Sequence, residues 1–433
     1  MRRLLILLFL LPLMAVAQIS KSAPRFQEFN TLTGAENLMQ KKGYWKHIEG
    51  KRVALIGNQT SVVRRSFLPD KESYTSDYTH LLDTLMAEGV KVVRIFCPEH
   101  GFRGNVEAGA VISNDVDAKT GIPIVSLYGK NKKPQVSLLK DVDIVLFDLQ
   151  DVGCRFYTYI STLTYVMEAC AEAGVPLMVL DRPNPNRGYI DGPVLEPQYR
   201  SFVGLHAVPI VYGMTIGEYG RMVLGEHWLW QTSKANKWIQ LSQAEYDSLT
   251  RNFTLIVVPL LNSKGFYKIP VYPSPNLQTD HAIAFYPSLC LFEGTRVSVG
   301  RGTPYPFEVI GSPTYYNTDQ ASLPKGTKLL DFTPQRIKGV SENPLHRGMV
   351  CHGLDLRGAD RPHKFDLTYI IEMHDRIGKM SFYLPNHFFD QLAGTTNLRL
   401  QLDMGMSEAK IRESWNKDLS AFKKIRERYL LYP

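Results

Sequence analysis

The sequence predicts an α/β protein in which a Rossmann-like domain with a parallel sheet is followed by a smaller α+β domain. Short apolar runs of strand length alternate with helical patterns in the first half of the chain, and parallel strands require such crossovers. Prolines interrupt the second half too often for long helices. About 416 residues follow the leader described next, which exceeds the size of one hydrophobic core.

The first 17 residues are interpreted as a cleaved secretory signal. Arg2 and Arg3 precede an apolar run that ends in Ala15-Val16-Ala17. The run is too short to span a bilayer comfortably, and no later segment reaches about 18 uninterrupted apolar residues. We therefore expect an exported protein, periplasmic or secreted, without a membrane span.

Residues 24–265 are assigned to the Rossmann-like domain. Its expected strands are 53–56, 92–96, 124–127, 144–147, 177–180 and 255–259. Helical spacing of apolar residues covers 78–89, 158–174 and 215–225. Polar residues follow the first five strands, and the carboxyl ends of parallel strands meet at one edge of a sheet. We therefore expect these polar clusters to line one crevice.

Residues 266–433 are assigned to the smaller α+β domain, where turns separate short strands. A strand is expected at 349–356 and a helix around 367–377. An amphipathic terminal helix is expected from Ser407 to about Arg428.

Composition and missing motifs exclude several classes of function. The formal charge of +8 falls to +6 without Arg2 and Arg3 and is spread along the chain, so we expect no nucleic-acid partner. Five cysteines without C-x-x-C spacing argue against a disulfide scaffold and a structural zinc site. The chain has no phosphate loop, G-x-S-x-G elbow or H-E-x-x-H pair, and Gly300–Tyr305 lacks the third glycine of a dinucleotide fingerprint. We expect no metal or organic cofactor.

The strongest local candidate for catalysis is Pro98-Glu99-His100-Gly101-Phe102-Arg103-Gly104. Glu99 follows an expected strand between a proline and a glycine, where a rigid backbone can hold a carboxylate in the crevice for proton transfer. A solvated glutamate in a surface turn is the alternative. His100 could tune Glu99 or bind substrate, or it could be a hydrogen-bonded structural histidine. Arg103 is a further candidate substrate contact.

Two more carboxylates follow the expected strand at 144–147. Asp148 and Asp151 flank Gln150 and could complete an acid/base pair or accept sugar hydroxyls. One of them could instead cap the helix that begins near Tyr157.

Arginines and other polar residues from both domains are candidates for substrate binding. They are Asn58, Gln150, Arg155, Tyr157, Arg182, Asn276, Arg296 and Arg301. A guanidinium can hold both oxygens of a carboxylate, although each arginine could equally serve in a salt bridge. Glu293 is the natural second carboxylate if the cleft lies between the domains, and a structural pair with Arg296 or Arg301 is its alternative.

Five ordered motifs resemble the family once labelled DUF1343, now associated with the exo-β-N-acetylmuramidase NamZ and glycoside hydrolase family 171. The motifs are Gly57-Asn58-Gln59-Thr60-Ser61, Pro98–Gly104, Asp148–Gly153 with Arg155–Tyr159, Asp181-Arg182-Pro183-Asn184-Pro185, and Phe292–Thr295 with Gly300–Thr303. The resemblance extends from about Gly43 to the C-terminus.

This resemblance implies an active site in the cleft between the two domains. It implies an enzyme that removes N-acetylmuramic acid from the non-reducing end of peptide-free peptidoglycan fragments during cell-wall turnover. The family's glutamate in P-E-H-G falls on Glu99, which becomes the expected general acid. Asp148, Asp151 or Glu293 would serve the opposite face of the sugar, unless the substrate's N-acetyl group replaces a protein nucleophile. Arginines from the motifs would hold the lactyl carboxylate.

Two other classes of function stay open. An ester or amide hydrolase would need a nucleophile beside a base, for which Ser61 and Cys97 are candidates, but no G-x-S-x-G elbow supports Ser61. A noncatalytic sugar- or muropeptide-binding protein would keep the aromatic and arginine side chains without needing the surroundings of Glu99.

Overall fold

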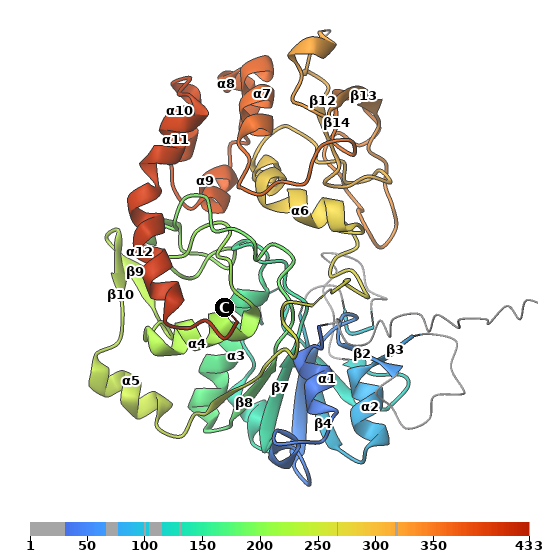
Figure 1. Cartoon of the computed structure of the whole chain (residues 1–433), viewed down its shortest axis with the longest axis vertical. Coiled ribbons are helices and arrows are strands. Elements are labelled where there is room, and N and C mark those ends of the chain that lie inside the picture. The colour runs from blue at the N-terminus through green and yellow to red at the C-terminus, as the bar shows by residue number, and fades with distance from the viewer. Residues whose placement is uncertain are drawn as a thin grey trace, which may run out of the picture.

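The computed structural model describes residues 31–65, 77–98, 101–103, 115–129, 131–265, 267–316 and 319–432. These residues form a domain around a seven-stranded sheet and a smaller domain around a three-stranded sheet, which lie end to end (Figure 1). The predicted α/β class is therefore confirmed. Glu99, His100 and the predicted signal segment 1–17 lie outside the described residues.

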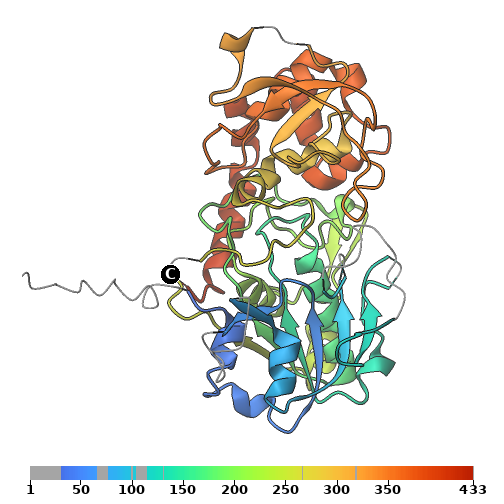
Figure 2. The same ribbon diagram turned by 90° about the vertical axis from the view of Figure 1, so that its right-hand side faces the viewer.

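The large sheet has the strand order β11-β8-β7-β1-β4-β6-β5. Its strands are β1 (Arg52–Gly57), β4 (Lys91–Cys97), β5 (Asp115–Val116), β6 (Pro123–Ser126), β7 (Ile144–Asp148), β8 (Leu177–Leu180) and β11 (Leu255–Val258). Every pairing is parallel except that of β5 with β6. Along the chain, the six parallel strands follow the Rossmann order 3-2-1-4-5-6. Their carboxyl ends face the smaller domain, as the arrowheads in Figure 2 show.

Side chains of the central strands alternate between two cores, because successive residues of a strand point to opposite faces. Ala54 and Ile56 of β1 belong to the larger core, which also holds residues of α3 (Tyr159–Ala173) and α4 (Ile216–Gly225). Val53 and Leu55 belong to the other core, with residues of α1 (Gly34–Leu38) and α2 (Leu81–Ala87). Helices thus cover both faces, and both faces of β1 are buried.

Short elements complete the first domain. They are the pair β2 (Val62–Arg64) and β3 (Tyr78–His80), the pair β9 (Thr232–Lys234) and β10 (Lys237–Ile239), and α5 (Gln243–Thr250). The helix predicted at 78–89 begins only at Leu81, because residues 78–80 pair with β2 and His80 caps the helix by accepting from the Leu82 backbone N–H.

The smaller domain packs helices against an antiparallel sheet of order β12-β14-β13. Its strands are β12 (Val309–Ser312), β13 (Lys328–Phe332) and β14 (Cys351–Asp355). Its helices are α6 (Asp280–Leu289), α7 (Thr368–Ile377), α8 (Lys379–Phe382), α9 (Phe388–Ala393), α10 (Asn397–Asp403), α11 (Glu408–Ser414) and α12 (Asn416–Glu427). The single terminal helix predicted from the sequence is therefore two helices. Their junction at Trp415 follows Ser414, whose hydroxyl donates to the Ile411 carbonyl.

The end of the chain returns to the first domain. Helix α12 runs down beside that domain, and the C-terminus lies against α4 (Figure 1). Arg426 donates to the Gly213 carbonyl, and the Leu431 backbone N–H donates to Glu218 at 2.8 Å. The Tyr432 hydroxyl donates to the buried Asp181 at 2.7 Å. The last residues of the chain are thus part of the structure around β8.

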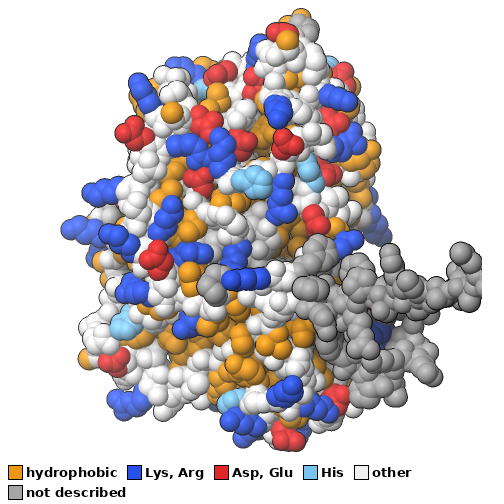
Figure 3. Space-filling model, in the orientation of Figure 1, with side chains coloured by type: hydrophobic (Ala, Val, Ile, Leu, Met, Phe, Trp, Pro, Cys, Tyr) orange, Lys and Arg blue, Asp and Glu red, His pale blue; other side chains and the backbone are white. Residues whose placement is uncertain are grey.

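Within the described ranges, no helix combines the length and apolar character needed to cross a bilayer. All five cysteines are buried and unpaired. Basic and acidic side chains intermingle on the face shown in Figure 3.

Candidate active site

The strand order of the large sheet reverses between β1 and β7, whose carboxyl ends lie side by side. From β1, the chain builds β4 and β6 on one side and β7, β8 and β11 on the other. Gly57 at the end of β1 is paired with Asp148 at the end of β7. Ligands of open α/β sheets bind outside the strands at such a switch point. The loops after β1, β7 and β8 therefore position the candidate residues Asn58, Asp148, Asp151 and Arg182.

Asn58, the first residue after β1, is fully buried and fixes the loop in which it lies. Its Nδ2 donates to the Tyr159 hydroxyl at 2.6 Å, and its Oδ1 accepts from the Thr60 backbone N–H at 2.9 Å. The Thr60 hydroxyl in turn accepts from the Gln150 backbone N–H at 3.1 Å. The loops after β1 and β7 are thus joined through Thr60.

Asp148 and Arg182 form an ion pair that is almost completely removed from solvent. Arg182 Nε and Nη2 donate to the two Asp148 carboxylate oxygens at 2.6 and 2.9 Å. Burial raises the pKa of the Asp148 carboxyl, while the facing guanidinium acts in the opposite direction. Both carboxylate oxygens are engaged, so a substrate hydroxyl would have to compete with a guanidinium.

Asp151 is also buried, but one of its oxygens is free. Its Oδ2 accepts from the Tyr212 hydroxyl and from the Gly153 backbone N–H, whereas Oδ1 has no hydrogen-bond partner among the described residues. Burial raises the pKa of this carboxyl to about 6. The neighbouring Gln150 donates through Nε2 to the Pro183 carbonyl, and its Oε1 accepts from the Tyr267 hydroxyl at 2.9 Å.

Arg155 joins the two domains through backbone carbonyls. Its Nη1 donates to Pro193 and Val208, and its Nη2 donates to Leu392 and Ala393 at the C-terminus of α9, at 2.7–2.9 Å in all four cases. Helix C-termini favour cations because their last carbonyls lack partners within the helix. Burial lowers the pKa of Arg155 to about 10. Both terminal nitrogens are engaged, whereas the buried Nε has no hydrogen-bond partner among the described residues, and binding by Arg155 stays a prediction.

An aromatic row leads from the strand ends into the smaller domain. Tyr157 packs edge-on against Tyr159 and Tyr286, with ring centroids 4.9 and 5.8 Å apart. Tyr286 packs in the same way on Phe307 at 5.0 Å, and the Arg301 guanidinium lies 5.1 Å from the Phe307 ring centre. The Tyr157 hydroxyl donates to the Pro273 carbonyl at 2.9 Å. Contacts therefore continue from Asn58, through Tyr159 and this row, to Arg301.

Glu293 lies at the far end of the row, on the 3-10 helix Cys290–Gly294. Its Oε1 accepts from Arg301 Nε. The Glu293 and Arg301 side chains remain 26% and 33% exposed. Among the carboxylates predicted for catalysis and described by the structure, Glu293 is the one that solvent reaches.

The remaining candidates are spread around this arrangement. Asn276 is buried and donates to the Val340 carbonyl at 3.0 Å, while Arg296 is exposed on the smaller domain. Arg103 binds Asp83 and Asp117 in two ion pairs on the side of the sheet that carries α2. Most of the described candidates thus lie between the strand ends and the smaller domain. Arg103 lies elsewhere and already forms ion pairs with two aspartates.

Comparison with known proteins identifies the family. Two family models, described as the N-terminal and C-terminal parts of the exo-β-N-acetylmuramidase NamZ, match residues 53–281 and 284–432. This chain belongs to the NamZ family. The match extends across both domains, and the predicted boundary at residue 265 stays a prediction.

Relatives of this NamZ-family chain agree with that assignment. The peptidoglycan β-N-acetylmuramidase NamZ of Bacillus subtilis (strain 168) is 38% identical over 410 residues, which cover 92% of this chain and 91% of the relative. The crystal structure of a DUF1343 family protein from Bacteroides fragilis NCTC 9343 has a TM-score of 0.75 at 38% identity and covers 93% of this chain and 99% of that one. A second such protein from the same organism gives 0.72 at 28% identity, with coverage of 94% and 100%.

Sequence reasoning missed the aromatic side chains that organise this NamZ-family site. Tyr286 of the smaller domain packs against Tyr157 of the first domain. The Tyr212 hydroxyl donates to Asp151, and the Tyr267 hydroxyl donates to Gln150. Local sequence gives little signal for them, because tyrosines at helical or strand spacing usually belong to an ordinary core. Asn58 and Tyr157 were predicted from motifs, and the structure shows that both contact Tyr159.

Proposed function

We propose that this chain is an exo-acting β-N-acetylmuramidase that hydrolyses terminal N-acetylmuramic acid from the non-reducing end of peptide-free peptidoglycan fragments. The observation that carries this proposal is the match of both NamZ family models, which together extend from residue 53 to residue 432. The similarity to the Bacillus subtilis peptidoglycan β-N-acetylmuramidase supports the same substrate class. The activity makes the protein a glycoside hydrolase.

Glycoside cleavage needs an acid that protonates the leaving oxygen and a second group on the opposite face of the sugar. Glu99 is the proposed general acid, because it comes two positions after the last residue of β4 in the sequence and matches the glutamate of the family's P-E-H-G motif. Glu293 is the proposed second carboxylate, since it is partly open to solvent while Asp148 and Asp151 are buried. The N-acetyl group of the substrate is the alternative to a protein nucleophile.

Arg296 and Arg301 are the proposed contacts of the lactyl carboxylate that distinguishes muramic acid from glucosamine. Arg296 is exposed, and the Arg301 side chain is one-third exposed. Arg155 and Arg182 are buried and already bind carbonyls or Asp148. Recognition by the two accessible arginines requires no rearrangement of the protein interior.

The geometry favours a glycosidase over the alternative hydrolases. The Ser61 hydroxyl donates to the Asp148 carbonyl at 2.6 Å and is buried, so it faces no base. Burial raises the pKa of the Cys97 thiol and keeps it protonated. Neither group is prepared to act as a nucleophile in this conformation.

The activity is tested with purified mature protein and a disaccharide that ends in N-acetylmuramic acid. We expect the wild type to release the sugar, and Glu99→Gln to lose about 10²–10⁴-fold in kcat because general acid catalysis is removed. Glu413→Gln, at an exposed position on α11, serves as the matched control and should retain full rate. No release by the wild type would favour the binding-protein alternative, and full activity of Glu99→Gln would remove Glu99 from its role.

We further propose that the protein is exported to the periplasm or the cell exterior, where peptidoglycan fragments arise. The leader with Arg2, Arg3 and Ala15-Val16-Ala17 supports this location. Mass spectrometry of protein recovered from the periplasmic and secreted fractions should find an N-terminus near Gln18. Recovery of the full-length chain from the cytoplasm would contradict export.

A further inference from the structure

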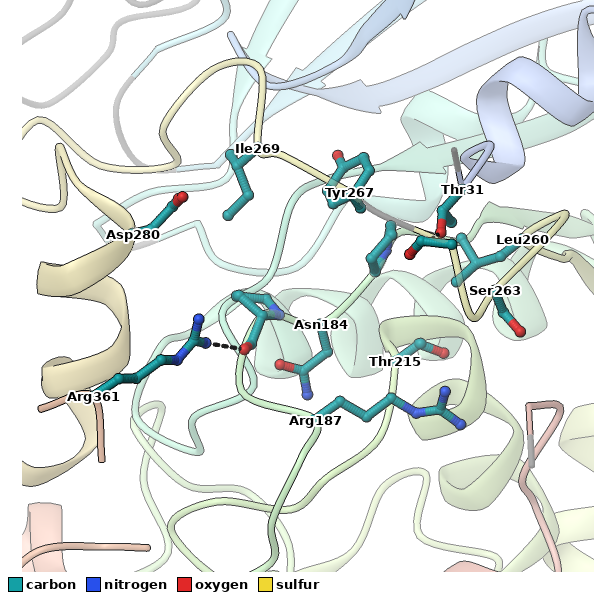
Figure 4. Close-up of a pocket in the computed structure, with 13 residues that line it drawn as sticks. Thr31, Asn184, Arg187, Thr215, Leu260, Ser263, Tyr267, Ile269, Asp280 and Arg361 are labelled. Carbon is teal, nitrogen blue, oxygen red and sulfur yellow. Dashed lines mark hydrogen bonds between the residues drawn. The ribbon is translucent and has the colours of Figure 1, made fainter. Parts of the chain in front are cut away.

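A hollow lies beside the carboxyl ends of β8 and β11. It has a volume of about 380 Å³. Residues after β8 and after β11, Thr31, Thr215, and the pair Asp280 and Arg361 from the smaller domain line it (Figure 4). Those after β8 are Pro183, Asn184, Pro185 and Arg187, and those after β11 are Leu260, Ser263, Gly265, Tyr267 and Ile269. None of the predicted catalytic or substrate-binding residues is among those that line it. Its size is within the range of small-molecule sites.

The wall of this hollow separates it from the candidate active site. The Tyr267 hydroxyl donates to Gln150, and Gln150 donates to the Pro183 carbonyl. Tyr267 and Pro183 line the hollow, whereas Gln150 lies behind them at the strand ends. A ligand in the hollow would therefore be separated from Gln150 by Tyr267 and Pro183.

One side of the hollow is apolar. Leu260 and Ile269 are 7% and 5% exposed and line it together with the Tyr267 ring and Pro183. Hydroxyl and carboxylate side chains, Ser263 and Asp280 among them, supply polar groups around this surface (Figure 4). An apolar wall with a few convergent polar groups suits a molecule that has both C–H faces and hydroxyl edges.

Two guanidinium groups give the hollow its charge. Arg361 donates through Nη2 to the Pro185 carbonyl, and its Nε and Nη1 make no hydrogen bond to a described residue. Arg187 donates through Nη2 to Glu218 and to the Tyr432 carbonyl. Its Nε and Nη1 also make no hydrogen bond to a described residue. The two side chains lie on either side of Asn184 (Figure 4). Guanidinium N–H groups that remain unused are suited to a carboxylate.

We propose that this hollow is a second binding site, separate from the catalytic centre, for a small sugar acid. Arg361 or Arg187 would bind its carboxylate, Asp280 would accept from hydroxyl or amide groups, and the wall around Ile269 would contact the ring. The choice of N-acetylmuramic acid as ligand rests on the proposed function, because that sugar acid is the expected product. The walls and charges alone indicate a hydroxylated carboxylate of this size.

The site is tested by isothermal titration of the mature wild-type protein with N-acetylmuramic acid. We expect two equivalents to bind per chain, and N-acetylglucosamine, which lacks the carboxylate, to bind at least tenfold more weakly at the second site. Arg361→Glu reverses a charge at an exposed position, and Ser263→Trp fills the hollow. Both variants should lose one equivalent while their rate of sugar release stays unchanged. Arg376→Ala, an exposed arginine of α7, is the control and should keep two.

Retention of all bound equivalents by both Arg361→Glu and Ser263→Trp would overturn the proposal. A soak of wild-type crystals that leaves the hollow without density for the sugar acid would also overturn it. Failure of the proposed function gives a different result. The wild type would then release no sugar, but it would still bind an equivalent of the sugar acid that Arg361→Glu does not bind. The two hypotheses can therefore fail independently.

Discussion

Carboxylates at the strand ends and the carboxylate of the smaller domain lie in opposite environments. Asp148 is fully buried, and a guanidinium engages both of its oxygens. Glu293 also pairs with an arginine, but its side chain is 26% exposed. A carboxylate and an arginine thus form an interior ion pair in one region and an accessible ion pair in the other. Removing one partner from a buried pair leaves an isolated charge in the interior, whereas an accessible pair can exchange its partner for a substrate.

The comparison predicts its largest effect for Glu293→Gln. This variant should lose about 10²–10⁴-fold in kcat for sugar release, because the proposed second carboxylate is replaced by an amide that cannot carry its charge. Its urea unfolding midpoint should match that of the wild type. Glu372→Gln is the control, since Glu372 also pairs with an arginine on the smaller domain. Wild-type kcat in Glu293→Gln would exclude this glutamate and reopen the choice of the second group.

Breaking the buried pair should affect stability instead. Arg182→Met leaves Asp148 without its partner, and we expect the free energy of unfolding to fall by about 3–5 kcal/mol. Arg301→Met removes the partner of Glu293 and should cost about 1 kcal/mol or less, because solvent screens the remaining charge. Urea denaturation of the two variants measures the difference. Equal losses would mean that burial does not distinguish the pairs.

The buried Asp151 should make the unfolding free energy depend on pH. Its folded pKa of about 6 is above the unfolded value of 3.8, so the folded state holds the proton more tightly. The contribution of Asp151 to stability is therefore present at low pH and is lost as pH rises from about 4 to about 6. The difference between the folded and unfolded pKa values corresponds to about 3 kcal/mol of unfolding free energy.

Asp151→Asn isolates this contribution. His80 and His206, whose pKa values burial lowers to about 4 and about 3, act in the opposite direction over the same pH range. Both histidines are present in the wild type and in the variant, so their effects cancel when the two proteins are compared. Between pH 4 and pH 7, we expect the unfolding free energy of the variant to rise by about 3 kcal/mol relative to that of the wild type. Urea denaturation across this range measures it, and parallel curves for the two proteins would refute the expectation.

The smallest expected effect concerns substrate binding by the accessible region. Arg296→Ala should raise KM for the muramic acid substrate about tenfold and leave kcat and stability unchanged, because a charged hydrogen bond contributes about 1.5–3 kcal/mol. The neighbouring exposed Arg347 offers the control Arg347→Ala. Should both variants keep the wild-type KM, the lactyl carboxylate must be bound by another residue.

Much of the first domain could be predicted because its strands are continuous apolar runs bounded by polar residues. The predicted strands 53–56, 144–147 and 177–180 agree with β1, β7 and β8 to within about a residue at each end. The two-residue β5 and the three-residue β9 and β10 were missed, since so few residues show no period. The break of the terminal helix at Trp415 depends on its tertiary contacts, so periodicity did not reveal it.

The candidate site could be predicted as a set of strand-end residues, but their environments could not. Asp148 and Glu293 have the same chemistry in the sequence, and only the packing of Arg182 and Arg301 separates them. Likewise, Arg155 follows a strand end like a binding residue, yet its guanidinium reaches carbonyls of Leu392 and Ala393 that are more than 230 positions away. Contacts over such separations depend on how the second domain docks.

The return of the chain to Asp181 has a consequence for biosynthesis. Asp181 follows a strand in the middle of the polypeptide, yet its carboxylate accepts a hydrogen bond from the hydroxyl of Tyr432. Glu218 likewise accepts from the Leu431 backbone N–H. A ribosome makes Leu431 and Tyr432 more than 200 positions after these two acids. The first domain, although it emerges early, can thus reach its final form only after Leu431 and Tyr432 are available to it, and an insertion directly before Leu431 would disturb those contacts.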